Sequence, residues 1–248
     1  MRWVLSFFAA CSLSAAPYDL VLQNGRLIDG TGQPARMGGL AIREGRIAAI
    51  GKVQGTAKRT IDVGGCIVAP GFIDVHTHAE NIEKNAAAIA FLRMGVTTLV
   101  LGNCGSSRID LGGYFAKLEN IGFSPNVASL IGHGTVRRQV MGGSFMRPPS
   151  MDELAAMQRL VRNAMRDGAV GMSTGLIYLP GTFSKTEELI ALSQEVAKSN
   201  GIYVSHMRSE GKEIFSLGCA ANVEPSLKLF NAMPFIALIF TSFGKYSK

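Results

Sequence analysis

The chain has 248 residues, of which 47% are hydrophobic and 17% charged, and its formal net charge is +7. This length and composition fit a folded globular protein and exclude an intrinsically disordered chain. The lysines and arginines are scattered, without a basic run or interleaved aromatic residues, so binding to nucleic acid is not indicated.

The first 16 residues are typical of an export signal. Met1 and Arg2 supply a positive start, residues 3–13 an apolar segment and residues 14–16 small side chains for cleavage. The apolar segment is too short to cross a bilayer as a stable helix. We therefore expect an exported protein, periplasmic or secreted, with no stable membrane span. Lipidation at Cys11 stays open, because the residues before it only faintly resemble a lipoprotein box.

Cleavage of such a signal would leave three cysteines, Cys66, Cys104 and Cys219. Three cysteines cannot all pair within one chain, and none belongs to a CxxC motif, so a disulfide framework is not expected. A thiolate bound to a metal would be a sensible use for one of them.

Residues 17–68 are expected to form a small all-β domain. Asn24-Gly25 and Glu44-Gly45 are pairs typical of hairpin turns, and alternating apolar residues flank both. The predicted strands are residues 18–22, 26–28, 40–43, 46–50, 60–63 and 66–68.

After Pro70 strands alternate with helices. The predicted strands are residues 72–75, 96–101, 127–131, 170–173 and 202–205. Helices are predicted near residues 81–94, 111–120, 151–167 and 184–200, with a longer linker after the third strand. Ser150 and Glu153 form a capping box for the third helix, and Ser184 and Glu187 are expected to cap the fourth. Repeated strand–helix units predict a parallel sheet and an α/β fold.

Side chains that carry chemistry lie at or just beyond the ends of these strands. The first strand runs into His76 and His78, and alternate residues of an extended strand point to the same side. Further along the chain the residues at strand ends are Cys104, His133, Tyr178 and His206. The carboxyl ends of parallel strands gather in one place in a barrel. Because neutral imidazoles that converge suit a borderline-soft divalent metal, we predict one metal site there.

Several segments, taken in order, resemble the amidohydrolase superfamily. Residues 69–78 are similar to its opening motif. A narrower resemblance, to the D-aminoacylase (N-acyl-D-amino-acid deacylase) family, lies in residues 102–105, 131–135, 175–181 and 205–210. This resemblance covers about residues 18–215. It implies a (β/α)8-like barrel flanked by a small β-sandwich, and hydrolysis of the amide of an N-acylated D-amino acid by zinc-activated water.

The same resemblance implies roles for individual residues. It makes His76, His78, Cys104 and His206 the ligands of one or two zinc ions. For Cys104 the alternative is a small buried side chain, because free cysteine packs well in cores.

Three further residues are candidates for contact with substrate. The resemblance places Tyr178 and Arg208 near the substrate, whereas a packed aromatic ring and a surface charge are the alternatives. His133 either touches substrate or orients a loop.

The length of the chain predicts an incomplete barrel. A closed eight-stranded barrel takes about 250 residues by itself, and residues 69–217 hold about five strand–helix units. We therefore expect a partial (β/α)8 TIM-like barrel there, preceded by a partial β-sandwich and followed by an aperiodic apolar tail at residues 218–248. The resemblance also implies a histidine after a sixth strand and a general-base aspartate after an eighth. Neither has a match here, and the aspartate is expected beyond the chain end.

Three functional hypotheses stay open from the sequence. The first is zinc-dependent hydrolysis of N-acyl-D-amino acids, which are small molecules. The second is a non-catalytic fragment that associates with itself or with a partner through an open barrel edge. The third is a cyclic-amide hydrolase of the same superfamily, which the loop around Cys104 disfavours. The glycines near residues 102–105 and 132–134 do not form a phosphate loop, so nucleotide binding is unsupported.

Overall fold

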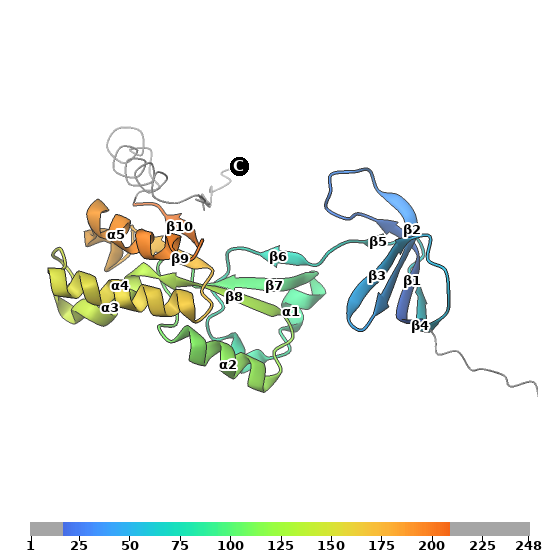
Figure 1. Cartoon of the computed structure of the whole chain (residues 1–248), viewed down its shortest axis with the longest axis horizontal. Coiled ribbons are helices and arrows are strands. Elements are labelled where there is room, and N and C mark those ends of the chain that lie inside the picture. The colour runs from blue at the N-terminus through green and yellow to red at the C-terminus, as the bar shows by residue number, and fades with distance from the viewer. Residues whose placement is uncertain (1–16, 209–248) are drawn as a thin grey trace, which may run out of the picture. The chain divides into compact units, whose positions relative to one another are not determined.

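The computed structural model describes residues 17–208 (Figure 1). The chain divides into two compact units whose boundary falls between Pro70 and Gly71. The sequence placed this boundary between residues 68 and 69. The predicted export signal, the end of the predicted barrel segment and the apolar tail lie outside the described residues. Within residues 17–208, no helix has both the length and the apolarity needed to cross a bilayer.

The first unit is one five-stranded sheet. Its strands are β1 (Tyr18–Leu27), β2 (Arg36–Arg43), β3 (Arg46–Gly51), β4 (Ala57–Asp62) and β5 (Ile67–Val68). The central strand β1 pairs antiparallel with β2 and parallel with β4 and β5, and β3 continues the sheet beyond β2. Glu44 and Gly45 join β2 to β3 with φ values of 52° and 71°, which confirms the predicted hairpin turn.

Asn24-Gly25 does not form a hairpin turn, and that prediction is wrong. β1 runs through both residues and pairs with β2 on either side of them. The register shifts between Leu22 and Gly25, where Asn24 adopts a φ of 60°. The pair therefore makes a β-bulge, which needs the same left-handed backbone conformation as a turn.

The second unit contains the predicted parallel sheet. Its strands are β6 (Phe72–Asp74), β7 (Val96–Leu101), β8 (Asn126–Gly132), β9 (Gly171–Gly175) and β10 (Ile202–His206). The spatial order is β10-β9-β8-β7-β6, and every pair is parallel. Each strand thus lies beside the next one along the chain, as in a barrel and unlike the order of a doubly wound sheet. The five strands form part of a (β/α)8 barrel, which confirms the predicted fold class.

Helices follow the strands and bury the core of this unit. The main helices are α2 (Leu111–Ile121), α3 (His133–Met141), α4 (Met151–Arg166) and α5 (Thr186–Ala197). Shorter elements are η1 (Ile82–Asn85), α1 (Ile89–Arg93), η2 (Gly142–Ser144) and η3 (Gly181–Phe183). Figure 1 shows α3, α4 and α5 gathered beside β9 and β10. Their apolar faces meet around Met172 of β9, Val161 and Leu192, all with no exposed surface. This packing fixes the helices against the sheet.

Two helix predictions in the first half of the barrel are wrong. The single helix predicted near residues 81–94 is divided into η1 and α1, because Ala88 between them adopts a φ of 45° that ends helical hydrogen bonding. The linker predicted after the third strand contains α3. That helix has glycine at its N-cap and buries His133 and Arg137. Because polar residues occupy part of its buried face, a search for apolar residues at helical spacing does not predict it.

The predicted cap of α4 is confirmed, whereas that of α5 is wrong. Ser150 and Glu153 exchange both hydrogen bonds of a capping box at the start of α4. At α5 the N-cap is Lys185, without a side-chain hydrogen bond. The Ser184 hydroxyl instead donates to the Gly181 carbonyl at 2.6 Å. Ser184 thus closes the preceding loop and leaves the helix uncapped by its side chain.

Candidate metal centre

His76 and His78 lie in the loop that follows β6. The strand ends at Asp74, whose carboxylate accepts a hydrogen bond from the His76 backbone amide at 3.2 Å. The two imidazole rings meet edge to face, with centroids 5.3 Å apart. The buried Asn103 holds this loop, because its side-chain amide donates to the Thr77 carbonyl at 3.4 Å and to the Val100 carbonyl at 2.8 Å. The two rings are therefore fixed relative to the end of β7.

Cys104 follows β7 in a tight loop with an unusual backbone. Its φ is 52°, and the glycines on both sides of the Asn103-Cys104 pair, Gly102 and Gly105, have φ values of 76°. A Cβ added to Gly175, at the end of β9, would lie 2.1 Å from the Cys104 carbonyl oxygen. Because only glycine allows so close an approach, the ends of β7 and β9 meet backbone to backbone. This contact holds the Cys104 thiol over the end of the sheet.

The predicted ligands converge on the Cys104 thiol. One ligand atom from each of His76, His78 and Cys104 falls within 4.8 Å of the other two. Cys104 Sγ lies 3.6 Å from His76 Nε2 and 3.3 Å from His206 Nδ1 at the end of β10. The structure thus brings all four predicted ligands to one place, from the first, second and fifth strands of the sheet.

These distances fit a zinc ion. With zinc–nitrogen bonds of about 2.0–2.1 Å and a zinc–sulfur bond of about 2.3 Å, tetrahedral geometry separates the two ligand atoms by about 3.6 Å. That value matches the His76–Cys104 separation. Two imidazoles and a thiolate are also donors that zinc prefers over magnesium or calcium. The donor set and its spacing therefore fit a borderline-soft divalent metal.

The protonation of His76 favours the same chemistry. Burial lowers the pKa of His76 below its ordinary value, and the neighbouring His78 and His206 lower it further, against a weaker opposing effect of Asp74. The neutral ring is the form that binds a metal. Within the described residues, His76 Nδ1 is buried and has no hydrogen-bond partner. The ring is thus not committed to a competing ion pair.

A cavity of about 210 Å³ adjoins the cluster. It is lined by His78, Cys104, Gly105, Ser106, Gly134, Arg138, Gly175, Tyr178, Leu179 and Gly181. The half-exposed Tyr178 packs its ring edge-on against His206, with centroids 4.8 Å apart. Two of the four predicted ligands and one predicted substrate residue therefore line a single opening that has room for part of a small molecule.

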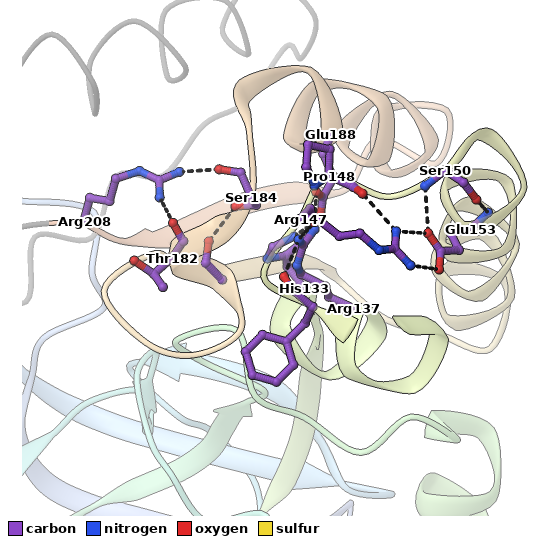
Figure 2. Close-up of polar contacts among 12 residues, drawn as sticks. His133, Arg137, Arg147, Pro148, Ser150, Glu153, Thr182, Ser184, Glu188 and Arg208 are labelled. Carbon is purple, nitrogen blue, oxygen red and sulfur yellow. Dashed lines mark hydrogen bonds and ion pairs between the residues drawn. The ribbon is translucent and has the colours of Figure 1, made fainter. Parts of the chain in front are cut away.

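The other two predicted substrate residues lie in hydrogen-bonded structure around this opening. Arg208 donates from Nη1 to the Thr182 carbonyl at 2.6 Å and from Nη2 to the Ser184 carbonyl at 2.8 Å (Figure 2). His133 is fully buried, and its Nε2 lies 2.8 Å from Glu188 Oε1. Arg208 thus supports the loop before α5, whereas His133 contacts α5 itself, and contact of either side chain with substrate stays a prediction.

Glu188 and Arg137 are site-supporting residues that the sequence did not reveal. The Glu188 carboxylate pairs with the fully buried Arg137, whose Nη2 also donates to the Phe145 carbonyl at 2.8 Å and the Arg147 carbonyl at 2.6 Å (Figure 2). Burial opposes ionisation of Glu188, but His133 and Arg137 together outweigh it and hold the pKa of Glu188 below its ordinary value. The four-residue spacing of His133 and Arg137 on one helix face would have revealed the pair, had α3 been predicted.

Comparison with known proteins gives consistent matches. A sequence model of the amidohydrolase family matches residues 59–216. A D-aminoacylase from Alcaligenes xylosoxydans xylosoxydans is 39% identical over 223 residues, which are 80% of this chain and 46% of that protein.

Two solved structures are similar in fold and sequence. A D-aminoacylase crystal structure superposes with a TM-score of 0.82 at 33% identity, over 90% of this chain and 51% of the other. An N-acyl-D-glutamate deacylase from Bordetella bronchiseptica, complexed with zinc and a phosphonate inhibitor, superposes with a TM-score of 0.78 at 34% identity. The superposition covers 89% of this chain and 50% of the other. The chain therefore spans about half the length of the relatives that it matches.

Proposed function

This chain belongs to the amidohydrolase family, and on that premise we propose that it acts in the zinc-dependent hydrolysis of the amide bond of N-acyl-D-amino acids. The observation that carries the proposal is the convergence of His76 and His206 on the Cys104 thiol, with His78 beside them. The proteins named D-aminoacylase and N-acyl-D-glutamate deacylase, to which the chain is similar, support the choice of substrate.

In this proposal the four side chains hold one or two zinc ions. Cys104 Sγ lies within 3.6 Å of both His76 Nε2 and His206 Nδ1, so the thiolate and the two imidazoles would be in position to hold the metal together. Bound zinc supplies a lowered pKa for water and polarisation of a carbonyl group. The hydrolysis breaks the carbon–nitrogen bond, adding a hydroxyl group to the acyl carbon and a hydrogen to the amino nitrogen.

Residues of this chain would shape the substrate site around the ligands. Tyr178 and the glycine-rich wall of the cavity would confine the substrate beside Cys104. Arg208 would hold the loop that carries Tyr178, through Thr182 and Ser184, and His133 would hold the following helix α5, through Glu188. An aspartate that accepts a proton from water, implied by the family resemblance, is not among the residues that line the described cavity.

The test is metal content and turnover of the purified full chain, with and without substitution of the central ligand. Cys104→Ser should weaken zinc binding by at least roughly 100-fold, because it removes the ligand that contacts two histidines. Mass spectrometry of bound metal and release of amine from N-acetyl-D-leucine, compared with its L-enantiomer, measure the two properties.

Cys66→Ser provides the matched control. Cys66 is a free, exposed cysteine in the first unit, so its loss should leave metal content and turnover unchanged. A wild-type chain that is folded but has neither zinc nor turnover would contradict the proposal and favour the non-catalytic alternative.

Export of the protein also stays a proposal. It is supported by the positive start and apolar segment of residues 1–16. Fractionation of cells that express the chain would test it, and recovery in the cytoplasm alone would contradict it.

A further inference from the structure

Arg138 lies on the wall of the cavity that adjoins the metal centre. α3 begins at His133, directly after β8 ends, so its first turns border the carboxyl end of the sheet. Arg138 lines the cavity together with His78, Cys104 and Tyr178. A side chain in this position can reach the same small molecule as the metal ligands.

Adjacent arginines of α3 have different surroundings. Arg137 is fully buried, and its guanidinium is occupied by Glu188 and by two backbone carbonyls. Arg138 is exposed, and its guanidinium makes one hydrogen bond within the described residues, from Nη2 to the Leu179 carbonyl at 3.2 Å. A guanidinium has five N–H donors, so most of the binding capacity of Arg138 remains for a ligand.

The charge of the cavity favours an anion. Arg138 is the one side chain with a permanent charge among the described residues that line it, and no aspartate or glutamate is present there. No carboxylate lies within 4.0 Å of Arg138 in residues 17–208 either, so its charge is not neutralised by an ion pair. A planar guanidinium matches the two oxygens of a carboxylate, which is the anion that an N-acyl amino acid carries.

We infer that Arg138 binds a carboxylate of the N-acyl amino acid and so contributes to specificity. This inference rests on the proposed function. The carboxylate can come from two sources, the α-carboxylate of any N-acyl amino acid or the acidic side chain of a glutamate or aspartate derivative. The bond to Leu179 aims the guanidinium at the wall that also carries Tyr178.

The experiment measures equilibrium binding to the zinc-loaded full chain by calorimetry, for wild type, Arg138→Ala and Arg138→Lys. The ligands are N-acetyl-D-glutamate, N-acetyl-D-leucine and the uncharged N-acetyl-D-leucinamide. Arg138→Ala should weaken binding of a recognised acid about tenfold and leave the amide unaffected, whereas Arg138→Lys should retain part of the affinity. Because the charge of Arg138 is exposed, added salt should weaken the binding of an acid that Arg138 recognises more strongly in the wild type than in Arg138→Ala.

Arg159→Ala is the control. Arg159 is an exposed arginine of α4 that lines no part of the cavity and makes no hydrogen bond or ion pair within the described residues, so binding should not change. Thermal unfolding of each variant establishes that it is folded.

Each outcome decides the inference. A loss for the glutamate derivative alone supports a side-chain carboxylate, and an equal loss for both acids supports the α-carboxylate. Unchanged binding of both acids to Arg138→Ala, or equal weakening of the amide, overturns the inference. Turnover is measured separately on the wild-type chain. If the wild type hydrolyses the substrate and Arg138→Ala binds both acids as tightly as the wild type does, only this inference is refuted. If the wild type binds acids in a way that depends on Arg138 but hydrolyses none of them, only the proposed function is refuted. If the wild type binds none of the ligands, the proposed function and this inference are both refuted.

Discussion

At the scale of single residues, the buried carboxylate of Glu188 is the most consequential group outside the proposed metal ligands. It lies between His133 and Arg137 of α3, and these three side chains are almost entirely removed from solvent. A buried charge of this kind is tolerated only because its partners are in place. The contacts of Glu188 with His133 and Arg137 therefore make the position of α3 depend on that of α5.

We predict that Glu188→Gln lowers the free energy of unfolding by about 3–5 kcal/mol, because it leaves the charge of Arg137 buried without a counter-ion. Denaturant unfolding of the full chain measures this loss. Glu187→Gln is the control, since Glu187 is the exposed neighbour on the same helix and should change stability little. A loss below about 1 kcal/mol for Glu188→Gln would mean that the pair adds little to the fold.

The convergence of the four proposed metal ligands was predictable from the sequence, because the ends of strands can be predicted. His76, His78, Cys104 and His206 each follow or end an apolar run, and the parallel sheet places such ends together. Arg138 and Glu188 were not predictable in this way. Both lie on helices, where their roles depend on which face meets the sheet, and the buried faces of α3 and α5 include charged or polar residues that do not mark themselves as buried in the sequence.

At the scale of elements, α4 shows how local chemistry fixes one end of a helix. The Glu153 carboxylate accepts from the Ser150 amide and forms two bonds with Arg147. The hydrogen bonds from Arg147 and Ser150 lower the pKa of Glu153 from 4.5 to about 2 and outweigh the opposing effect of desolvation. The folded state thus holds this carboxylate ionised over a range in which the unfolded state is protonated.

The pH dependence of stability follows from that shift. Because the folded pKa lies below the unfolded value, the contribution of Glu153 is complete above about pH 4.5 and is lost as the pH falls through about 2. Glu153→Gln should therefore flatten the fall in unfolding free energy over this window. Denaturant unfolding at a series of pH values measures it.

Glu119→Gln is the control for this series. Glu119 is exposed on α2 and its side chain makes no hydrogen bond or ion pair within the described residues, so its replacement should leave the pH profile unchanged. Equal profiles for wild type and Glu153→Gln would contradict the assignment.

The elements themselves were mostly predictable, and the exceptions share a cause. Asn24 adopts the left-handed backbone that the sequence indicates, but a bulge can use this conformation as well as a turn. Ala88 breaks a helix without a glycine or proline to mark the break. Ser184 is a suitable cap by residue type, yet its hydroxyl donates to the Gly181 carbonyl and the helix begins one residue later, with Lys185 as its N-cap. In each case the sequence permits more than one local structure, and residue type alone does not choose between them.

At the scale of the whole molecule, the candidate metal centre draws side chains from distant strands of the sheet. Its proposed ligands follow β6 and β7 and end β10, which are the two outer strands and one inner strand of the described order. A metal bound there would tie the first strand of the barrel to the fifth. Binding to the folded state should then stabilise the unit against unfolding.

We predict that zinc at 100 times its dissociation constant raises the free energy of unfolding by about 2.7 kcal/mol, and that a chelator removes this gain. Thermal or denaturant unfolding with and without zinc measures it. The gain should be absent in Cys104→Ser and present in Cys66→Ser. Equal stability of the wild-type chain with zinc and with chelator would show that the cluster does not bind the metal in the folded state.

The backbone contact between Gly175 and the Cys104 loop has a consequence for how such a site can evolve. Gly105 is confined in the same way, since a Cβ there would lie 2.7 Å from the Gly175 amide nitrogen. Neither loop can gain a side chain at these positions unless the other moves, so the two are constrained to change together. A lineage that acquires a new substrate would therefore change the cavity more easily through exposed positions of α3, such as Arg138, than through the loops that carry the metal ligand.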